Sequence, residues 1–241
     1  MTAALEAIGL RKRFGTLQAA NDVTLSVEAA EIRGLIGPNG AGKTTLVNLV
    51  TGVHAPDSGE VKLAGQPITG LQMHEIARRG LVRTFQVTRL FGNQTVRENL
   101  MTAFYARRPA NVDGEAVAER MIDLTKLRLL ADTPAKKLSG GQRALLQMGC
   151  GFMVPGSCYV LDEPFSGINP VIKDAIIDMI VDVNRSSGAT FLIVSHEMTI
   201  VRRLCPKVTV MMEGSVAATG SLDEVARLPE VIAGYLGREL E

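Results

Sequence analysis

Short, largely apolar runs alternate along the chain with longer segments of helical periodicity. Residues 32–36, 157–161 and 190–194 are mostly apolar without polar alternation, which is the pattern of strands buried within a parallel sheet. Residues 5–10 and 22–28 instead alternate apolar and polar positions, which indicates a small antiparallel sheet. Because strands and helices alternate, the sequence predicts an α/β fold with a mostly parallel core sheet and an N-terminal antiparallel β subdomain.

Helical signals predict most of the remaining elements. A helix from Pro170 to about Ser187 begins with proline, which suits a first turn, and stops at Gly188. The chain is predicted to be a single domain, 1–241. Its core consists of residues 1–86 and 138–241, and residues 87–137 are predicted to form an inserted α-helical subdomain. The other predicted elements are strands at 60–63 and 81–85, helices at 71–79, 95–106 and 114–130, a hairpin at 207–220 and a helical tail at 221–236.

A glycine-rich stretch follows the predicted strand at 32–36 and precedes an apolar helix start, which is the order expected of a phosphate-binding loop. Its glycines can take positive φ, so that backbone N–H groups turn inward around a triphosphate. Lys43 places an ammonium near the β- and γ-phosphate oxygens, and the Thr44 hydroxyl suits Mg²⁺. The alternative is a glycine-rich turn beside a surface lysine. The predicted ATP-binding residues are Gly37, Pro38, Asn39, Gly40, Ala41, Gly42, Lys43, Thr44 and Thr45.

Composition and charge narrow the possible functions. The 241 residues are 46% apolar, which is enough for one large core or two unequal lobes. A net charge of +1 and an aromatic content of 4% without tryptophan argue against nucleic acid as the main partner. The three cysteines, Cys150, Cys158 and Cys205, have no CxxC spacing and are expected to be apolar fillers in a reducing cytosol. We expect no secretion signal and no membrane span; if the protein works at a membrane, another chain must carry the spans.

Two further segments carry candidate chemistry. Residues 138–142 precede an apolar helix, where Ser139 suits an N-cap and the free amides suit an anion; a capped helix without a ligand is the equal alternative. Asp162 and Glu163 follow the strand at 157–161 and are costly there unless something compensates their charge. Strand alternation points them to different sides, so Asp162 is expected to reach a magnesium shell while Glu163 faces the γ-phosphate and a water. The alternative is a solvated acidic turn.

Phe14 and His196 are weaker candidates on their residues alone. Phe14 lies between two N-terminal strands, where an exposed ring beside Gly15 is suited to stacking on a flat base, although most phenylalanines are core. His196 follows the strand at 190–194, and a histidine there is more often a cap or a packed side chain than a catalytic group. Several candidates nevertheless follow strands, and α/β sheets hold their sites at the carboxyl ends of strands.

Five motifs in this order along the chain resemble those of the ATP-binding subunits of ABC transporters. They are Gly37 to Thr44, Gln86, Leu138 to Gln142, Leu161 to Pro164 and His196. The likeness covers nearly the whole chain. Phosphate-binding loops occur in many nucleotide enzymes, but Leu-Ser-Gly-Gly-Gln followed by a strand ending in Asp-Glu-Pro is highly specific to ABC ATPases. The resemblance implies the P-loop ABC ATPase fold and ATP hydrolysis coupled to transport.

The resemblance also implies how the site is assembled. Two such chains, either two copies or a pair of paralogues, would form a head-to-tail dimer that holds ATP and Mg²⁺ between one phosphate-binding loop and the partner's signature segment. The implied signature residues are Leu138, Ser139, Gly140, Gly141 and Gln142. The other implied roles are adenine stacking by Phe14, catalysis by Lys43, Gln86, Glu163 and His196, and magnesium ligation by Thr44, Gln86 and Asp162.

The partners and cargo follow from the family in the same way. Closure of the dimer would drive separate transmembrane permease subunits from the cytoplasmic face of the membrane, in a complex with an extracytoplasmic solute-binding protein and without nucleic acid. Residues 83–91, the pair Asn169-Pro170 and residues 231–237 look most like importers of branched-chain amino acids. Urea and amide importers are closely similar, and the ATPase of lipopolysaccharide export is a near cousin. ATPase subunits do not touch the cargo, so the solute is not encoded in this chain.

Three features depart from the family pattern. Gly149 and Gly151 lie in the helix after the signature, where each glycine costs about 1 kcal/mol relative to alanine, so a less rigid helix is expected. Asn169 stands where most of the superfamily has aspartate, which affects the contact expected across the dimer. The segment Cys205-Pro206-Lys207 lacks the acidic residue usual before its strand, and its meaning is open.

Three rival functions are weaker. A soluble ABC ATPase acting on ribosomes or DNA would show two cassettes, a long coiled coil or a basic face, and none is visible. An inactive nucleotide-binding scaffold is disfavoured because Lys43, Asp162, Glu163 and His196 are all present. A small-molecule kinase that uses the same loop would leave residues 138–142 without a purpose.

Overall fold

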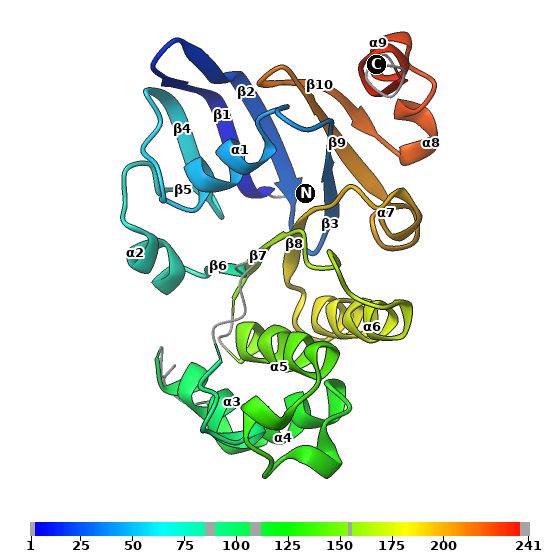
Figure 1. Ribbon diagram of the computed structural model, residues 1–241. Coiled ribbons are helices and arrows are strands. Elements are labelled where there is room, and N and C mark those ends of the chain that lie inside the picture. Colours follow the sequence, from blue (N-terminus) through cyan, green and yellow to red (C-terminus); the bar gives the residue numbers. More distant parts are fainter. Residues whose placement is uncertain (1–2, 85–89, 107–111, 154–155, 237–241) are drawn as a thin grey trace.

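The computed structural model describes residues 3–84, 90–106, 112–153 and 156–236, and within these ranges the strands form two sheets (Figure 1). The first sheet has the order β2-β1-β4-β5, and all its neighbouring strands are antiparallel. The alternating pattern near the N-terminus is therefore confirmed as antiparallel pairing. The strands are β1 (Ala3–Phe14), β2 (Leu17–Glu28), β4 (Ser58–Leu63) and β5 (Gln66–Pro67).

The second sheet has the order β10-β9-β3-β8-β7-β6. Its neighbours are parallel except for β9 and β10, which form the predicted hairpin. Because β3, β7 and β8 are adjacent and parallel, the segments that follow them emerge at one edge of the sheet. The strands are β3 (Ile32–Ile36), β6 (Leu81–Thr84), β7 (Cys158–Asp162), β8 (Thr190–Val194), β9 (Lys207–Met212) and β10 (Ser215–Gly220).

Most helices follow the predicted segments, but α7 was not predicted, the helical tail is divided into α8 and α9, and one predicted helix ends early. Helix α4 ends at Leu124, not near residue 130, because Lys126 adopts a left-handed φ of 58° that breaks the helical path; a 3₁₀ turn follows at Arg128–Leu130. No helix of the described ranges is long and apolar enough to cross a bilayer. The helices are α1 (Lys43–Val50), α2 (Met73–Arg78), α3 (Val96–Tyr105), α4 (Gly114–Leu124), α5 (Gly140–Phe152), α6 (Pro170–Ser187), α7 (Met198–Leu204), α8 (Leu222–Val225) and α9 (Pro229–Leu236), with a second 3₁₀ turn at Ala135–Lys137.

The parallel sheet separates two hydrophobic cores. In β8, Leu192 and Val194 pack with α1 and the antiparallel sheet, whereas Phe191 and Ile193 pack with α5 and α6. Successive residues of a strand point to opposite faces, so a strand that is apolar throughout serves both cores. This explains why the central strands lack an alternating pattern and why α1 is held firmly against the sheet edge that carries the loops.

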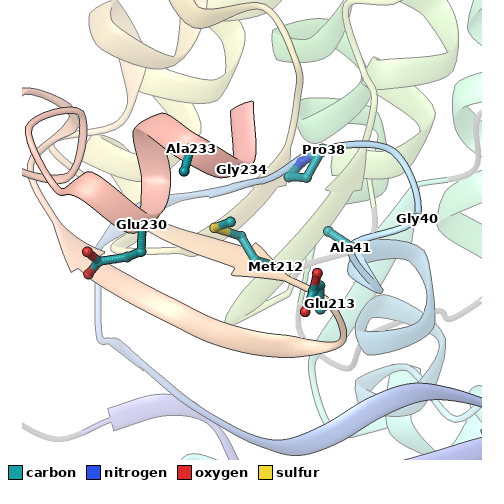
Figure 2. A pocket seen from close by; sticks show the side chains of 8 residues that line it. All are labelled: Pro38, Gly40, Ala41, Met212, Glu213, Glu230, Ala233 and Gly234. Atoms are coloured by element: carbon teal, nitrogen blue, oxygen red, sulfur yellow. The ribbon is translucent and has the colours of Figure 1, made fainter. Parts of the chain in front are cut away.

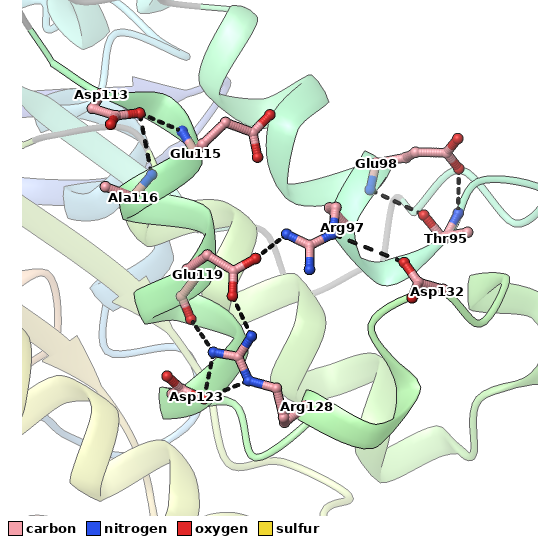
Figure 3. A network of polar contacts seen from close by, with 10 residues as sticks. All are labelled: Thr95, Arg97, Glu98, Asp113, Glu115, Ala116, Glu119, Asp123, Arg128 and Asp132. Atoms are coloured by element: carbon pink, nitrogen blue, oxygen red, sulfur yellow. Dashed lines mark hydrogen bonds and ion pairs between the residues drawn. The ribbon is translucent and has the colours of Figure 1, made fainter.

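Ion pairs connect the helices of the segment between the two core parts (Figure 3). Glu119 on α4 binds both Arg97 on α3 and Arg128 in the following 3₁₀ turn, and Arg128 also binds Asp123. The hydrogen bonds from Arg128 and Arg97 lower the pKa of Glu119. The carboxylate is exposed, so the network orients α3 against α4 more than it adds stability. The assignment of 87–137 to a separate subdomain remains a prediction.

Gly149 has a packing reason in this arrangement. A Cβ at this position would lie 2.9 Å from Thr125 Cγ2 and 3.3 Å from Leu100 Cδ2, so glycine lets α5 approach α3 and the end of α4 closely. The helix therefore gains contact where the sequence indicated only a loss of helix propensity. Asn169 likewise has a local role, because its side chain accepts a hydrogen bond from Ile172 N at 3.0 Å and caps α6.

The three cysteines are free thiols, and Cys158 and Cys205 are buried. Burial raises the pKa of each, Cys150 included, to about 12, so all three are protonated at neutral pH. They behave as small apolar side chains.

Candidate functional site

The glycine-rich loop runs from the end of β3 to the first turn of α1. Gly40 and Gly42 have φ values of 80° and 95°, and Gly42 is the N-cap of α1, which begins at Lys43. Left-handed backbone costs other residues roughly 1–2 kcal/mol, so glycine is favoured at both positions. The loop therefore presents the positive end of the α1 dipole and its free amides to the space beyond the sheet edge.

Other parts of the chain fix the loop closely. A Cβ on Gly37 would lie 2.2 Å from the Met211 carbonyl oxygen of β9, and one on Gly42 would lie 2.5 Å from the Ala19 carbonyl oxygen of β2. Gly214, in the turn after β9, donates its N–H to the Ala41 carbonyl at 3.1 Å. The loop is thus held between the antiparallel sheet and the β9–β10 hairpin.

Replacing Gly37 by alanine is expected to lower the free energy of unfolding by about 1–3 kcal/mol, because the added methyl meets backbone that cannot rotate away. ATP affinity should fall with it, since the loop must move. The matched control is Gly70→Ala, which also places alanine at a positive φ, of 76°, but whose Cβ meets nothing within 4 Å and which does not line the cavity. Urea unfolding and equilibrium ATP binding measure both effects. If both variants lost the same stability and the same ATP affinity, the Met211 carbonyl would be able to move away from the added methyl group.

The loop opens onto a cavity of about 650 Å³. This cavity contains the predicted loop residues from Asn39 onward together with Asp162 and Glu163, whereas Phe14, His196 and residues 138–142 do not line it. The sequence did not single out the rest of its wall, which comes from the start of β2, the end of β8 and the turn after β9. The lining residues are Leu17, Gln18, Ala19, Asn39, Gly40, Ala41, Gly42, Lys43, Thr44, Thr45, Asp162, Glu163, Val194, Glu213 and Gly214.

A second cavity of about 420 Å³ shares Gly40, Ala41 and Glu213 with the first (Figure 2). Helix α9 forms its opposite wall through Glu230, Ala233 and Gly234, and Pro38 and Met212 complete it. A Cβ on Gly234 would lie 1.8 Å from Met212 Cε, so α9 rests directly on the hairpin that supports the loop.

Lys43 is held against its own loop. Its Nζ donates to the carbonyl oxygens of Gly37 at 2.6 Å and Pro38 at 3.0 Å. Burial lowers the pKa of the Lys43 ammonium, and the charges of Glu163 and Asp162 oppose that shift. The ammonium is therefore bound to the loop carbonyls and lies within electrostatic range of the two acidic residues.

Glu163 and His196 form a contact across the ends of β7 and β8. Glu163 follows the last residue of β7 with a left-handed φ of 50°, and its N–H donates to the Val194 carbonyl at 3.0 Å. Its Oε2 lies 2.9 Å from His196 Nδ1 but is buried and makes no hydrogen bond with any described group. Strand alternation is therefore not what separates Glu163 from Asp162: a strained turn after the strand directs Glu163, and both residues line the same cavity.

Phe14 ends β1 and remains 43% exposed. Its ring meets His54 edge to face at a centroid distance of 5.4 Å, and the Lys12 ammonium lies 5.7 Å from its centroid. Flat aromatic faces that stay exposed suit stacking, and the ring is held beside β2, whose first residues line the cavity. Adenine stacking on Phe14 remains a proposal.

Comparison with known proteins identifies the family. Residues 20–166 match the family model described as ABC transporter. The chain belongs to the ABC transporter family. It is 37% identical, over 98% of its length and 96% of the relative's, to the "Probable branched-chain amino acid transport ATP-binding protein LivG" of Archaeoglobus fulgidus. It is 35% identical, over 97% of both chains, to the high-affinity branched-chain amino acid transport ATP-binding protein BraF of Pseudomonas aeruginosa.

Solved structures agree with this membership. The ADP conformation of an ATP-binding cassette of an ABC transporter superposes with a TM-score of 0.85 at 30% identity, covering 99% of this chain and all of that chain (100%). A nucleotide-free cassette gives a TM-score of 0.84 at 30% identity, covering 98% and 99% of the two chains. The predicted ABC ATPase fold is therefore confirmed, and the chain is an ATP-binding ABC ATPase.

Residues 138–142, which the sequence predicts to be the signature segment, lie at the N-terminus of α5. The Ser139 hydroxyl accepts from Gln142 N at 3.2 Å, and the Gln142 side chain accepts from Ser139 N at 2.8 Å, so the two residues form a capping box. Gly141 lies against α6, where a Cβ would meet Ile172 at 2.7 Å. In Figure 1, α5 lies with α3 and α4, on the other side of the parallel sheet from α1. Within one chain, the signature is therefore separate from the phosphate-binding loop.

Gln86 lies outside the described residues, so its predicted roles remain proposals. Sequence reasoning missed Leu17, Gln18 and Ala19, which line the cavity although nothing in their types indicates a ligand. It also missed Arg83 as a partner of Asp162, because a single arginine within a predicted strand carries no spacing signal. Only the pairing of β6 beside β7 brings Arg83 to Asp162.

Proposed function

We propose that this ABC ATPase is the motor subunit of an importer of branched-chain amino acids or a related small polar solute. The observation that carries the motor assignment is the single cavity that joins the loop amides, Lys43, Thr44, Asp162 and Glu163. Its volume of about 650 Å³ suits a nucleotide. Phosphoryl transfer needs positioning and charge neutralisation above all, and these residues supply both.

Each side chain has a distinct role in this proposal. The loop amides and the Lys43 ammonium hold the β- and γ-phosphates and lower the cost of charge that develops there. Glu163 accepts the proton of the attacking water, and its buried Oε2, which has no hydrogen bond among the described groups, is an acceptor available for that water. His196, 2.9 Å from the same oxygen, contacts the γ-phosphate and keeps the carboxylate in place.

The donor set fits magnesium. Thr44 and Asp162 offer oxygen ligands at the same cavity, and the described residues contain no cluster of three or more His, Cys, Asp or Glu that forms a metal cage. Mg²⁺ commonly takes one or two protein oxygens and completes its shell with water and phosphate oxygens, so a sparse set is appropriate. When bound, the ion would neutralise charge on the phosphates. Thr44 and Asp162, with Gln86, would hold it.

The separation of the signature from the loop supports a dimer in which each chain completes the other's site. Ser139 to Gln142 lie at a helix start with exposed Ser139 and Gly140, which suits an anion from a partner. A head-to-tail pair of these chains, or of this chain and a paralogue, would place that segment over the partner's loop. Closure of the pair would drive permease subunits at the cytoplasmic face of the membrane.

The solute assignment rests on the relatives. Those at 34–37% identity over nearly the full length are named as branched-chain amino acid transport ATP-binding proteins. We propose the same cargo class here, delivered by a solute-binding protein to the permease. Urea or amide import and lipopolysaccharide export are the alternatives.

Purification of the tagged chain from membranes, followed by identification of the attached chains, tests this proposal. We expect two permease subunits and a second cassette. After reconstitution into vesicles with the matching solute-binding protein, leucine or isoleucine should stimulate ATP hydrolysis, and urea should not. If urea alone stimulated hydrolysis, or if an export complex co-purified, the proposed solute would be wrong. The proposed role as a motor subunit would still hold.

A further inference from the structure

Asp162 has a charged neighbour that the site described so far does not use. Arg83 Nη2 on β6 lies 3.0 Å from Asp162 Oδ2, and the two side chains are only 11% and 13% exposed. The same guanidinium donates through Nη1 to Asn48 Oδ1 at 2.6 Å and approaches Thr51 Oγ1 at 3.4 Å. One arginine therefore connects the carboxylate at the end of β7 to α1, the helix that begins at the phosphate-binding loop.

The connection fixes the carboxylate and compensates its charge. A carboxylate removed from water is costly unless it is paired, and Arg83 supplies the pairing. The guanidinium is a rigid planar fork, so bonds to Asn48 and Asp162 from its two terminal nitrogens set its plane. Since a carboxylate is also planar, holding Oδ2 restricts where Oδ1 lies.

The position of Asn48 on α1 determines which part of the site the Asp162 carboxylate is aligned with. Thr44 and Asn48 are four residues apart on α1, so they lie on one face of the helix, one turn apart. Arg83 therefore aligns Asp162 with the same helix face that presents the Thr44 hydroxyl, and Thr44 and Asp162 both line the cavity. Mg²⁺ demands near-ideal octahedral geometry at about 2.0–2.1 Å, so it is sensitive to the relative placement of these two oxygens.

We propose that Arg83 is a positioning residue for the magnesium site: it holds the Asp162 carboxylate in register with Thr44 through Asn48. This rests on the proposed magnesium-dependent function. Arg83 itself does not line the cavity, so it acts through Asp162 and not through the nucleotide. The consequence is specific: loss of Arg83 should weaken the contribution of magnesium to nucleotide binding more than nucleotide binding itself.

The test compares binding of a non-hydrolysable ATP analogue, adenylyl imidodiphosphate, to the full chain in excess Mg²⁺ and in EDTA. For Arg83→Met we expect the gain in affinity that Mg²⁺ provides to fall by about tenfold. The affinity in EDTA should stay within about twofold. Arg79→Met is the matched control, since Arg79 is exposed and donates to the Pro67 carbonyl at 2.8 Å. It should keep both affinities.

Asn48→Ala removes the other anchor of the guanidinium and should reduce the magnesium gain in the same direction. If Arg83→Met has no cooperative thermal transition and therefore does not fold, the Asn48→Ala variant tests the proposal in its place. The proposal is overturned if both variants retain the full magnesium gain, or if affinity falls equally with Mg²⁺ and in EDTA, which a purely structural role would produce. If the unsubstituted chain binds the analogue equally well with and without Mg²⁺, the proposed magnesium site itself fails.

Discussion

Glu163→Gln should abolish ATP turnover, with a loss of about 10²–10⁴-fold, because glutamine keeps the shape of the side chain but cannot accept a proton. ATP binding should remain, so the variant should accumulate as an ATP-bound dimer. Steady-state phosphate release measures the first effect, and size-exclusion chromatography with ATP measures the second.

The matched control for this variant is Glu60→Gln. Glu60 lies on β4 and pairs with Lys62 at 3.1 Å, with its side chain 43% exposed, so the same chemical change occurs away from the cavity. Its turnover should match that of the unsubstituted chain. Near-normal hydrolysis by Glu163→Gln would remove Glu163 from the role of base and would make the contact with His196 a structural one.

Local signals in the sequence were sufficient for many elements. Helix α6 runs from Pro170 to Ser187 as its proline start and glycine stop predict. The strand at 190–194 is likewise β8, since a short, mostly apolar run between turn signals favours a strand buried on both faces. The backbone conformation of the glycine-rich loop was also predictable, because the positive φ values of Gly40 and Gly42 follow from residue types within nine positions.

The parts that were not predictable depend on long-range contacts or strained backbone. The direction of Glu163 is set by a left-handed residue after β7, which strand alternation cannot represent. Arg83 meets Asp162 across 79 positions of sequence, so only the strand order reveals the pair. The end of α4 depends on Lys126 adopting positive φ, although lysine has good helix propensity.

These two groups of findings have a common physical basis. Residues that bind phosphate through the backbone need particular φ values, and glycines in the sequence indicate where such values occur. Residues that hold a charged side chain in place need a partner from another element, and that partner can be any cation at a suitable distance. The site therefore combines a loop that the sequence specifies with an acidic pair whose supports, Arg83 and His196, are specified by the fold.

Lys43→Ala is expected to reduce ATP affinity by about 10–100-fold, because a charge-assisted hydrogen bond to a phosphate oxygen contributes roughly 1.5–3 kcal/mol. The loop should loosen as well, since the Nζ bonds to Gly37 and Pro38 are lost. Equilibrium binding of ATP measures the affinity, and thermal unfolding without nucleotide separates the loss of the phosphate contact from the loss of loop stability.

Lys62→Ala provides the control for Lys43→Ala, because Lys62 forms a partly exposed ion pair with Glu60 on β4 and does not line the cavity. Exposed pairs contribute about 0–1 kcal/mol, so its ATP affinity should not change measurably. If Lys43→Ala bound ATP as tightly as the unsubstituted chain, the phosphate would lie elsewhere and the cradle assignment would be wrong. If affinity fell only in proportion to a lower melting temperature, Lys43 would act on the loop alone. A loss of affinity well beyond the loss of stability is the result that places the ammonium on the phosphate.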